Sequence, residues 1–166
     1  MNIIKGRVWT FGDLIDTDVI LPHSYLTTSN PEELVTHAFE SVYENFHKEV
    51  KPGDIIVAGK NFGTGSSREE AVYVLKQMGI TAVVADSIAR IYYRNLINLG
   101  IYAIQIPGIS KDVKKGDELS INCEKGVFTN VTQSKTYSFL PFSGFILNLI
   151  KTGGAINFLK QNLGKH

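Results

Sequence analysis

A glycine-rich stretch at residues 59–71 separates two apolar segments of this chain. The preceding residues 55–58, Ile-Ile-Val-Ala, are typical of a short buried strand. The following residues 71–78 are typical of a helix, which Gly79 ends. Glycines let the backbone turn sharply, and the free N–H groups at a helix start attract anions. The pattern therefore predicts strand, loop and helix, with Arg68 placed to pair with a carboxylate or a phosphate.

Local sequence leaves two interpretations of this loop open. Ser66 and Glu69 have the spacing of a capping box, in which case the loop only begins a helix. In the other interpretation the same residues surround an anion. The loop is not a Walker A motif, because no Gly-Lys-Ser/Thr ends it, and Arg68 stands where a dinucleotide fingerprint needs its third glycine. The two commonest nucleotide-binding motifs are therefore excluded.

Composition narrows the class of protein. A length of 166 residues suits one domain, residues 1–166, and a net charge of +1 gives no reason to expect a nucleic-acid or membrane partner. The single cysteine, Cys123, excludes an internal disulfide and cannot alone hold zinc or an iron–sulfur cluster, so we expect a small buried side chain. No leader-like segment or transmembrane-length apolar run is visible, which predicts a cytoplasmic protein.

Strand-like and helix-like segments alternate over the first two thirds of the chain. After a first strand and a helix capped by Asn30, this alternation predicts right-handed crossovers and a parallel sheet. Ligands of such sheets bind at the carboxyl ends of the strands, where the glycine loop lies. Short strands separated by turn residues then predict antiparallel pieces, followed by two helices. The expected strands are 3–11, 55–58, 81–85, 101–106, 116–123, 126–131 and 136–140, and the expected helices are 31–46, 71–78, 87–96, 142–150 and 155–163.

Three aspartates, Asp13, Asp16 and Asp18, crowd into six residues near the first strand. Three carboxylates suit calcium, but the spacing lacks the glycine and the distal glutamate of a calcium-binding loop. The alternative is a turn in which the aspartate side chains accept hydrogen bonds from nearby N–H groups. The histidines at positions 23, 37 and 47 do not have metal-ligand spacing either.

Three motifs in order resemble the swivelling domain of the aconitase superfamily, in particular the stand-alone small subunits of isopropylmalate dehydratases and homoaconitases. They are residues 16–18 (Asp-Thr-Asp), residues 59–69 (Gly-x-Asn-Phe-Gly-x-Gly-Ser-Ser-Arg-Glu) and residues 89–95 (Ala-Arg-Ile-Tyr-Tyr-Arg-Asn). The resemblance covers nearly the whole chain. It implies an α/β fold of three β/β/α layers, with a parallel central sheet and a second, antiparallel sheet.

The resemblance also implies a reaction and roles for four residues. The family moves a hydroxyl between adjacent carbons of a malate-like acid by dehydration and rehydration, which needs a base and partners for two carboxylates. By resemblance, Ser66 is the base, acting as an alkoxide, and Arg68 binds a substrate carboxylate with help from Ser67. Asp18 lines the substrate pocket. A free serine hydroxyl is too weak an acid for this role, so positive surroundings must favour its ionised form.

The family's Lewis acid for the leaving hydroxyl is a [4Fe-4S] cluster held by three cysteines. A chain with one cysteine cannot supply them, so the resemblance implies a hydro-lyase active only with a cluster-bearing large subunit. Arg90 and Arg94 match the family too, but we expect both to pair with carboxylates or carbonyls near the surface.

Substrate choice is expected in the loop at residues 24–28. Family members that bind tricarboxylates have an arginine at the position of Thr27, whereas isopropylmalate-type members have apolar residues in this region. Burying a third carboxylate without a cation is costly, so Thr27 favours an uncharged alkyl substituent and a place in leucine biosynthesis. A homoaconitase or dimethylmalate-type enzyme, or a non-catalytic module that binds a carboxylate, are the alternatives.

Overall fold

The chain forms a curled, mixed sheet with helices packed against it, which the computed structural model describes for residues 3–27 and 30–164. The strands are β1 (Ile3–Thr10), β2 (Ile55–Ala58), β3 (Ala82–Ala85), β4 (Tyr102–Gln105), β5 (Glu118–Asn122), β6 (Val127–Asn130) and β7 (Lys135–Ser138). The α-helices are α1 (Thr17–Ile20), α2 (Pro31–Thr36), α3 (Phe46–Glu49), α4 (Glu70–Gln77), α5 (Arg90–Asn98), α6 (Gly144–Lys151) and α7 (Ala155–Leu163). Two 3₁₀ turns, η1 (His23–Tyr25) and η2 (Ile109–Asp112), lie between them.

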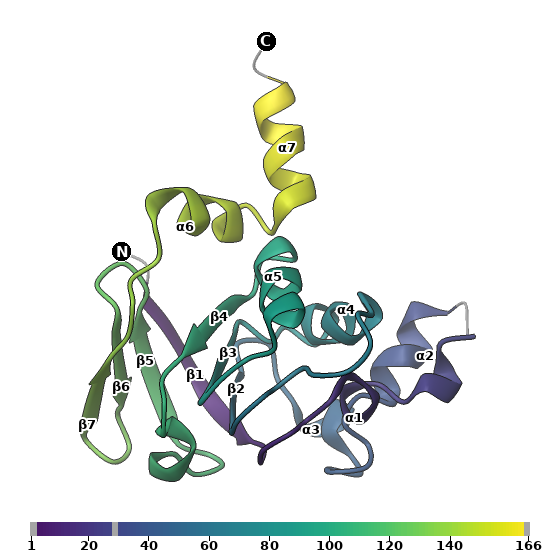
Figure 1. Ribbon diagram of the computed structural model, residues 1–166, viewed down its shortest axis with the longest axis horizontal. Coiled ribbons are helices and arrows are strands. Elements are labelled where there is room, and N and C mark those ends of the chain that lie inside the picture. Colours follow the sequence, from purple (N-terminus) through teal and green to yellow (C-terminus); the bar gives the residue numbers. More distant parts are fainter. Residues whose placement is uncertain (1–2, 28–29, 165–166) are drawn as a thin grey trace.

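The described strands follow the order β4-β3-β2-β1-β5-β6-β7. The pairs among β1, β2, β3 and β4 are parallel, and those among β1, β5, β6 and β7 are antiparallel. Both predicted sheets are therefore present, and β1 belongs to both. Figure 1 shows α4 and α5 beside the parallel strands, with α7 extending away from the sheet.

Side chains on the two faces of strand β2 belong to two different hydrophobic cores. All four of its side chains are buried, so it reads as a continuous apolar run rather than an alternating one. Ile56 and Ala58 face the core that the helices share with Trp9, whereas Ile55 and Val57 face the core under β5 and β6. Cys123 is buried in the second core, as predicted.

The predicted helix over residues 31–46 is wrong in its length. The Asn30 side chain caps α2 as expected, by accepting from the Glu32 N–H at 3.0 Å, but α2 ends at Thr36. Phe39 has a φ of 55°, and its N–H donates to the Ile20 carbonyl at 2.9 Å. This left-handed turn lets Phe39 and Phe46 both enter the core, where their rings lie 5.1 Å apart.

Helix α5 begins at Arg90, three residues later than predicted, because the chain before it pairs with the glycine loop. Phe62 donates to the Ser87 carbonyl at 3.1 Å, and Ala89 donates to the Phe62 carbonyl at 2.8 Å. The Ile88 N–H donates to the Gln105 side chain at 2.8 Å. Among the described helices, none is long and apolar enough to cross a membrane.

Candidate active site

The glycine loop leaves β2 at its carboxyl end and is shaped by contact with α5. Gly63 has a φ of 84°, and a Cβ at this position would lie 2.3 Å from Cγ of Tyr92. Only glycine fits this close approach without strain. Tyr92 is buried, its hydroxyl donates to the Ala71 carbonyl at 2.8 Å, and burial raises its pKa well above the usual value. The Tyr92 ring therefore packs against Gly63 while its hydroxyl is bonded to Ala71, and so it fixes the glycine loop relative to the start of α4.

The aspartate-rich segment lies directly against the glycine loop. Thr17 donates its N–H to the Thr64 carbonyl at 2.8 Å, and Gly63 donates to the Ile15 carbonyl at 2.7 Å. Asp16 and Thr64 form a short parallel bridge. Two motifs that are almost fifty residues apart in sequence, roughly a third of the chain, thus form one surface.

Arg68 is enclosed where these two segments meet. Its Nη2 donates to the Thr17 hydroxyl at 3.2 Å, and its Nη1 lies 3.4 Å from Nδ1 of His23. The Asp18 carboxylate is 3.8 Å from Nη2 and 65% exposed, whereas the Arg68 side chain is 13% exposed. Asp18 accepts a shorter bond, of 2.8 Å, from the His23 N–H. Nε of Arg68 is buried and has no hydrogen-bond partner within residues 3–27 and 30–164. An enclosed guanidinium with long contacts and an unused donor is short of a strong anionic partner.

Ser66 and Ser67 are exposed beside Arg68, and neither caps the helix. Of the two interpretations of this loop, the capping box is therefore wrong. Glu69, with φ −63° and ψ −31°, occupies the N-cap position, so α4 begins at Glu70, four residues beyond Ser66. Gly65, with a φ of 99°, turns the chain just before the two serines. The Ser66 hydroxyl is consequently not engaged in capping α4 and faces solvent.

A cavity of about 270 Å³ opens at this point between the glycine loop and α5. Ser66, Ser67 and Arg68 line it from one side, and Arg90 and Asn95 line it from the other. The structure thus brings three of the five predicted site residues to one cavity. The surface pairing expected of Arg90 is not found, because this side chain is exposed and forms no ion pair within the described part of the chain.

Two residues that contact Arg68, Thr17 and His23, were not predicted from the sequence. Thr17 lies inside the Asp-Thr-Asp motif, and its burial was the available signal: a threonine beside isoleucine and valine at helical spacing faces the core. No sequence signal marks His23, because its contact with Arg68 spans 45 residues.

The aspartates have structural roles: Asp16 and Asp18 accept from local N–H groups, as the turn interpretation expects, whereas Asp13 accepts from the distant glycine loop. Asp13 accepts from the Lys60 N–H at 2.7 Å, and Asp16 accepts from the Val19 N–H at 2.9 Å. No group of three or more His, Cys, Asp or Glu in the described ranges is placed to hold a metal ion. Burial raises the pKa of Cys123 to about 12, so this residue is a poor metal ligand. The residues described do not fit an iron–sulfur cluster.

Thr27 is exposed and does not line the cavity. It follows the turn η1, which the sequence had suggested only as a loop. Thr28, the last residue of the expected specificity loop, lies outside the described residues.

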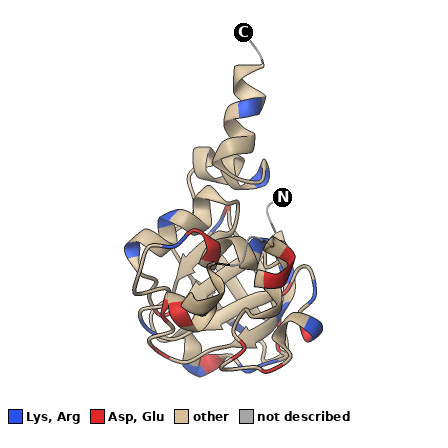
Figure 2. Ribbon diagram, turned by 90° about the vertical axis from the view of Figure 1, so that its right-hand side faces the viewer, with Lys and Arg blue, Asp and Glu red and all other residues tan. Residues whose placement is uncertain are grey.

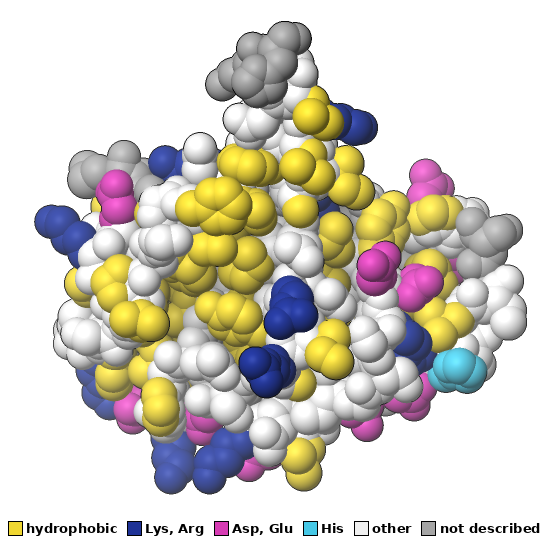
Figure 3. All heavy atoms as spheres, turned by 45° about the horizontal axis from the view of Figure 1, so that its top comes forward, with side chains coloured by type: hydrophobic (Ala, Val, Ile, Leu, Met, Phe, Trp, Pro, Cys, Tyr) yellow, Lys and Arg dark blue, Asp and Glu magenta, His cyan; other side chains and the backbone are white. Residues whose placement is uncertain are grey.

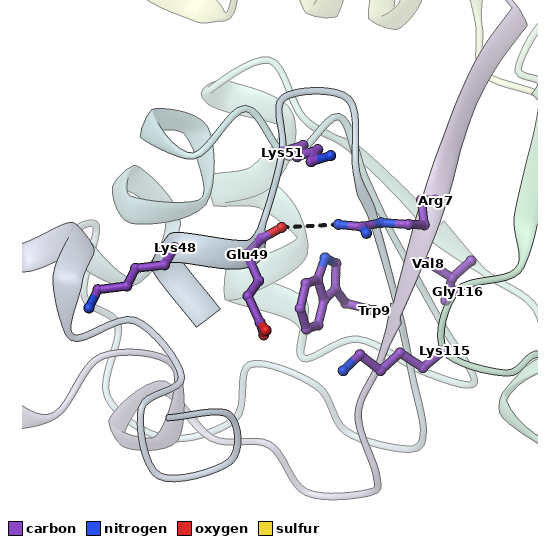
Figure 4. Close-up of a pocket in the computed structure, with 8 residues that line it drawn as sticks. All are labelled: Arg7, Val8, Trp9, Lys48, Glu49, Lys51, Lys115 and Gly116. Carbon is purple, nitrogen blue, oxygen red and sulfur yellow. Dashed lines mark hydrogen bonds between the residues drawn. The ribbon is translucent and has the colours of Figure 1, made fainter. Parts of the chain in front are cut away.

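A second pocket, of about 340 Å³, lies beside Trp9 at the opposite end of β2 from the glycine loop (Figure 4). Two of its polar side chains, those of Arg7 and Trp9, are engaged with the buried Asp54. The Trp9 indole donates to Asp54 at 2.8 Å, and Arg7 donates to Asp54 at 3.1 Å and to a carbonyl of α3. The Lys115 ammonium lies 4.6 Å from the centre of the Trp9 ring. Arg7, Trp9 and Asp54 therefore have a structural role, and the cavity at the glycine loop remains the candidate active site.

Comparisons with known proteins identify the family of the chain. Residues 17–108 match the family described as the aconitase C-terminal domain. The 3-isopropylmalate dehydratase small subunit of Aliarcobacter butzleri is 52% identical over 165 residues, which cover 99% of each chain. The isopropylmalate/citramalate isomerase small subunit of Methanocaldococcus jannaschii is 47% identical, over 99% of this chain and 98% of that protein. A solved structure described as 3-isopropylmalate dehydratase from Methanocaldococcus jannaschii superposes with a TM-score of 0.88 at 45% identity, over 96% of this chain and 95% of that one.

Proposed function

We propose that this chain, which belongs to the aconitase C-terminal-domain family and within it to the small subunits of 3-isopropylmalate dehydratase, contributes half of a hydro-lyase active site. The observation that carries the proposal is the enclosed Arg68 guanidinium, with an unused Nε donor, beside two exposed serine hydroxyls. We propose that residues 1–166 form a single domain and that the protein acts in the cytoplasm.

Arg68 is the proposed partner of a substrate carboxylate. A guanidinium can donate two parallel hydrogen bonds to one carboxylate, and this geometry is available because Asp18 lies 3.8 Å away and leaves room for a closer anion. The Thr17 hydroxyl accepts from Nη2 and the His23 ring lies near Nη1, so these two residues hold the guanidinium in place. Asp18 does not line the cavity; it lies 3.8 Å from Arg68 and accepts a hydrogen bond from the His23 N–H, so its proposed role is to position Arg68 and His23. Ser67 is the proposed assistant in binding the carboxylate.

Ser66 is the proposed base that takes the carbon-bound proton. Its hydroxyl has no role in capping α4, so it is available for this task. A serine hydroxyl ionises only where positive charge stabilises the alkoxide. Because α4 begins four residues beyond Ser66, the proposed stabilising groups are the cations of the cavity, Arg68 and Arg90, rather than the helix terminus.

The other half of the site belongs to a partner. The leaving hydroxyl needs a Lewis acid, which a [4Fe-4S] cluster provides in this superfamily. The residues of this chain do not fit such a cluster, so we propose that a large subunit carries it. The names of the relatives, which are small subunits, support this division.

The proposed substrate is an isopropylmalate, interconverted between its 2- and 3-hydroxy forms through isopropylmaleate. Thr27 offers no cation for a third carboxylate. One relative's name joins isopropylmalate with citramalate, and both acids carry an uncharged alkyl group.

The test is reconstitution of the full chain with its cluster-loaded large subunit and assay of a panel of substrates. We expect turnover of 3-isopropylmalate and none of cis-homoaconitate, and no turnover by either subunit alone. Turnover of cis-homoaconitate would mean that another cation replaces the missing arginine and would overturn the substrate assignment. Carboxylate binding by this chain alone, without turnover in any mixture, would indicate a non-catalytic module.

A further inference from the structure

The C-terminal helices present a large apolar surface to solvent. No residue of α7 is buried, and Ile156, Leu159 and Leu163 are 67%, 56% and 73% exposed. These three side chains follow the helical spacing i, i+3 and i+7, so they form one stripe. Phe145 on α6 is 62% exposed, and Leu140 before α6 is 90% exposed. Of ten large apolar side chains exposed in the described residues, these five lie within 24 residues of one another.

The figures show that this surface stands out from the domain. In Figure 1, α7 projects beyond the sheet, and in Figure 3 apolar side chains gather around its base and along α6. Ala155 and Phe158, both partly buried, pack α7 against the core, whereas its stripe of Ile156, Leu159 and Leu163 is exposed. Apolar patches of this kind mark binding surfaces.

The apolar surface is continuous with the candidate active site through α5. Asn95 lines the cavity that contains Ser66 and also lines a second cavity, about 230 Å³, between α5 and Ile156. At the site end of α5, Ile91 is 55% exposed. A nine-residue helix is about 13 Å long, so one protein that covers the active-site cavity also reaches α7.

Charge distinguishes between two occupants of this surface. From Lys125 to the end of the chain there is no aspartate or glutamate. Figure 2 accordingly shows basic residues but no acidic ones on α6 and α7, which carry Lys151 and Lys160. In a two-fold dimer of this chain, the same cationic face would meet itself, which is unfavourable. A different protein with an apolar patch rimmed by carboxylates is complementary.

We infer that the apolar face formed by Leu140, Phe145, Ile156, Leu159 and Leu163 is the docking surface for the large subunit. This inference rests on the proposed function, because that function supplies the partner. It adds that α7 is the anchor of the interface and that the partner extends from the active-site cavity along α5 to this helix.

The experiment measures the affinity of the full-length chain for the cluster-loaded large subunit by calorimetry. Leu159→Glu places a charge in the centre of the stripe, and glutamate is a good helix former, so the fold is retained. Val131→Glu is the matched control, because Val131 is 53% exposed in the turn between β6 and β7. We expect Leu159→Glu to raise the Kd at least about 10-fold, as for a central interface residue, and Val131→Glu to change it less than about twofold. Circular dichroism and Tm check that both variants fold.

Three outcomes would overturn either the docking inference or the proposed function. If the unmodified chain binds the large subunit and Leu159→Glu binds equally well, the docking inference is wrong while the proposed function stands. If the unmodified chain does not bind the large subunit at all, the proposed function itself fails. If sedimentation shows that the unmodified chain dimerises and Leu159→Glu does not, with large-subunit affinity unchanged, the face belongs to a second copy.

Discussion

Replacing Arg68 with lysine separates the catalytic part of the proposal from the stability of the fold. Lysine keeps the positive charge but cannot donate two parallel hydrogen bonds to a carboxylate. The loss of one charge-assisted hydrogen bond costs about 1.5–3 kcal/mol. Since about 1.4 kcal/mol is a factor of ten in rate, Arg68→Lys should lower kcat/KM roughly 10- to 150-fold.

The same substitution should change folding stability little. The contacts of Arg68 within the chain are long, at 3.2, 3.4 and 3.8 Å, and its carboxylate neighbour Asp18 is 65% exposed. Exposed ion pairs contribute about 0–1 kcal/mol, which corresponds to a Tm change of less than about 4 °C for a chain of this size.

Arg7→Lys is the matched control. Arg7 is bonded to the buried Asp54 at 3.1 Å and to the Glu49 carbonyl at 3.0 Å, at the opposite end of β2 from the site. This variant should lose stability, by about 1–2 kcal/mol, and keep kcat/KM within about twofold. The assay is steady-state turnover of 3-isopropylmalate by the reconstituted complex, with thermal melts of each free variant. Arg68→Lys with normal kcat/KM, or with a loss that only follows its lower stability, would refute the role given to Arg68.

Three further predictions concern the glycine loop and the fold away from it. Gly63→Ala should lower Tm by about 4–8 °C, because its Cβ would meet Tyr92 at 2.3 Å and its φ is 84°, whereas Gly12→Ala, with open space around it, should leave Tm nearly unchanged. Burial opposes ionisation of the Asp117 carboxyl, but three hydrogen bonds to it outweigh burial and hold its pKa below the usual range. The Asp117→Asn variant should therefore be less stable than the unmodified chain at pH 7. In urea melts this difference in stability should vanish as the pH falls through and below 4, where the carboxylate becomes protonated. The Cys123 thiol, with a pKa of about 12, should not react with a thiol reagent at pH 8 until the protein is unfolded, and rapid labelling of folded protein would contradict its burial.

Local sequence patterns were sufficient for the framework of the fold. The apolar run of β2, the glycine loop and α4 follow from hydrophobicity and glycine placement alone, and so does the change from parallel to antiparallel strands. The long helix expected over residues 31–46 failed because tertiary packing overrides helical periodicity: burying both Phe39 and Phe46 beside Trp9 requires a left-handed turn. No local pattern carries that information.

The candidate site was predictable in its residue types but not in its contacts. The Gly-Ser-Ser-Arg motif indicated an anion site at a strand end, and the structure places Ser66 and Arg68 at one cavity. The Thr17–Arg68 bond spans 51 residues, so only the fold brings these side chains together. The capping box failed for a similar reason: the loop turns at Gly65 to meet Thr17 and delays the start of α4.

The role of Ser66 as base is best examined by comparing Ser66→Ala with Ser67→Ala in the reconstituted complex. Both hydroxyls are exposed in the same loop and line the same cavity, so each variant is the other's control. Removing a positioned base costs about 10²- to 10⁴-fold in kcat, which we expect for Ser66→Ala, with unchanged affinity for the large subunit. Ser67→Ala should mainly raise KM. Near-normal kcat for Ser66→Ala would contradict the assignment of the base, and a loss confined to Ser67→Ala would transfer that role to the neighbouring hydroxyl.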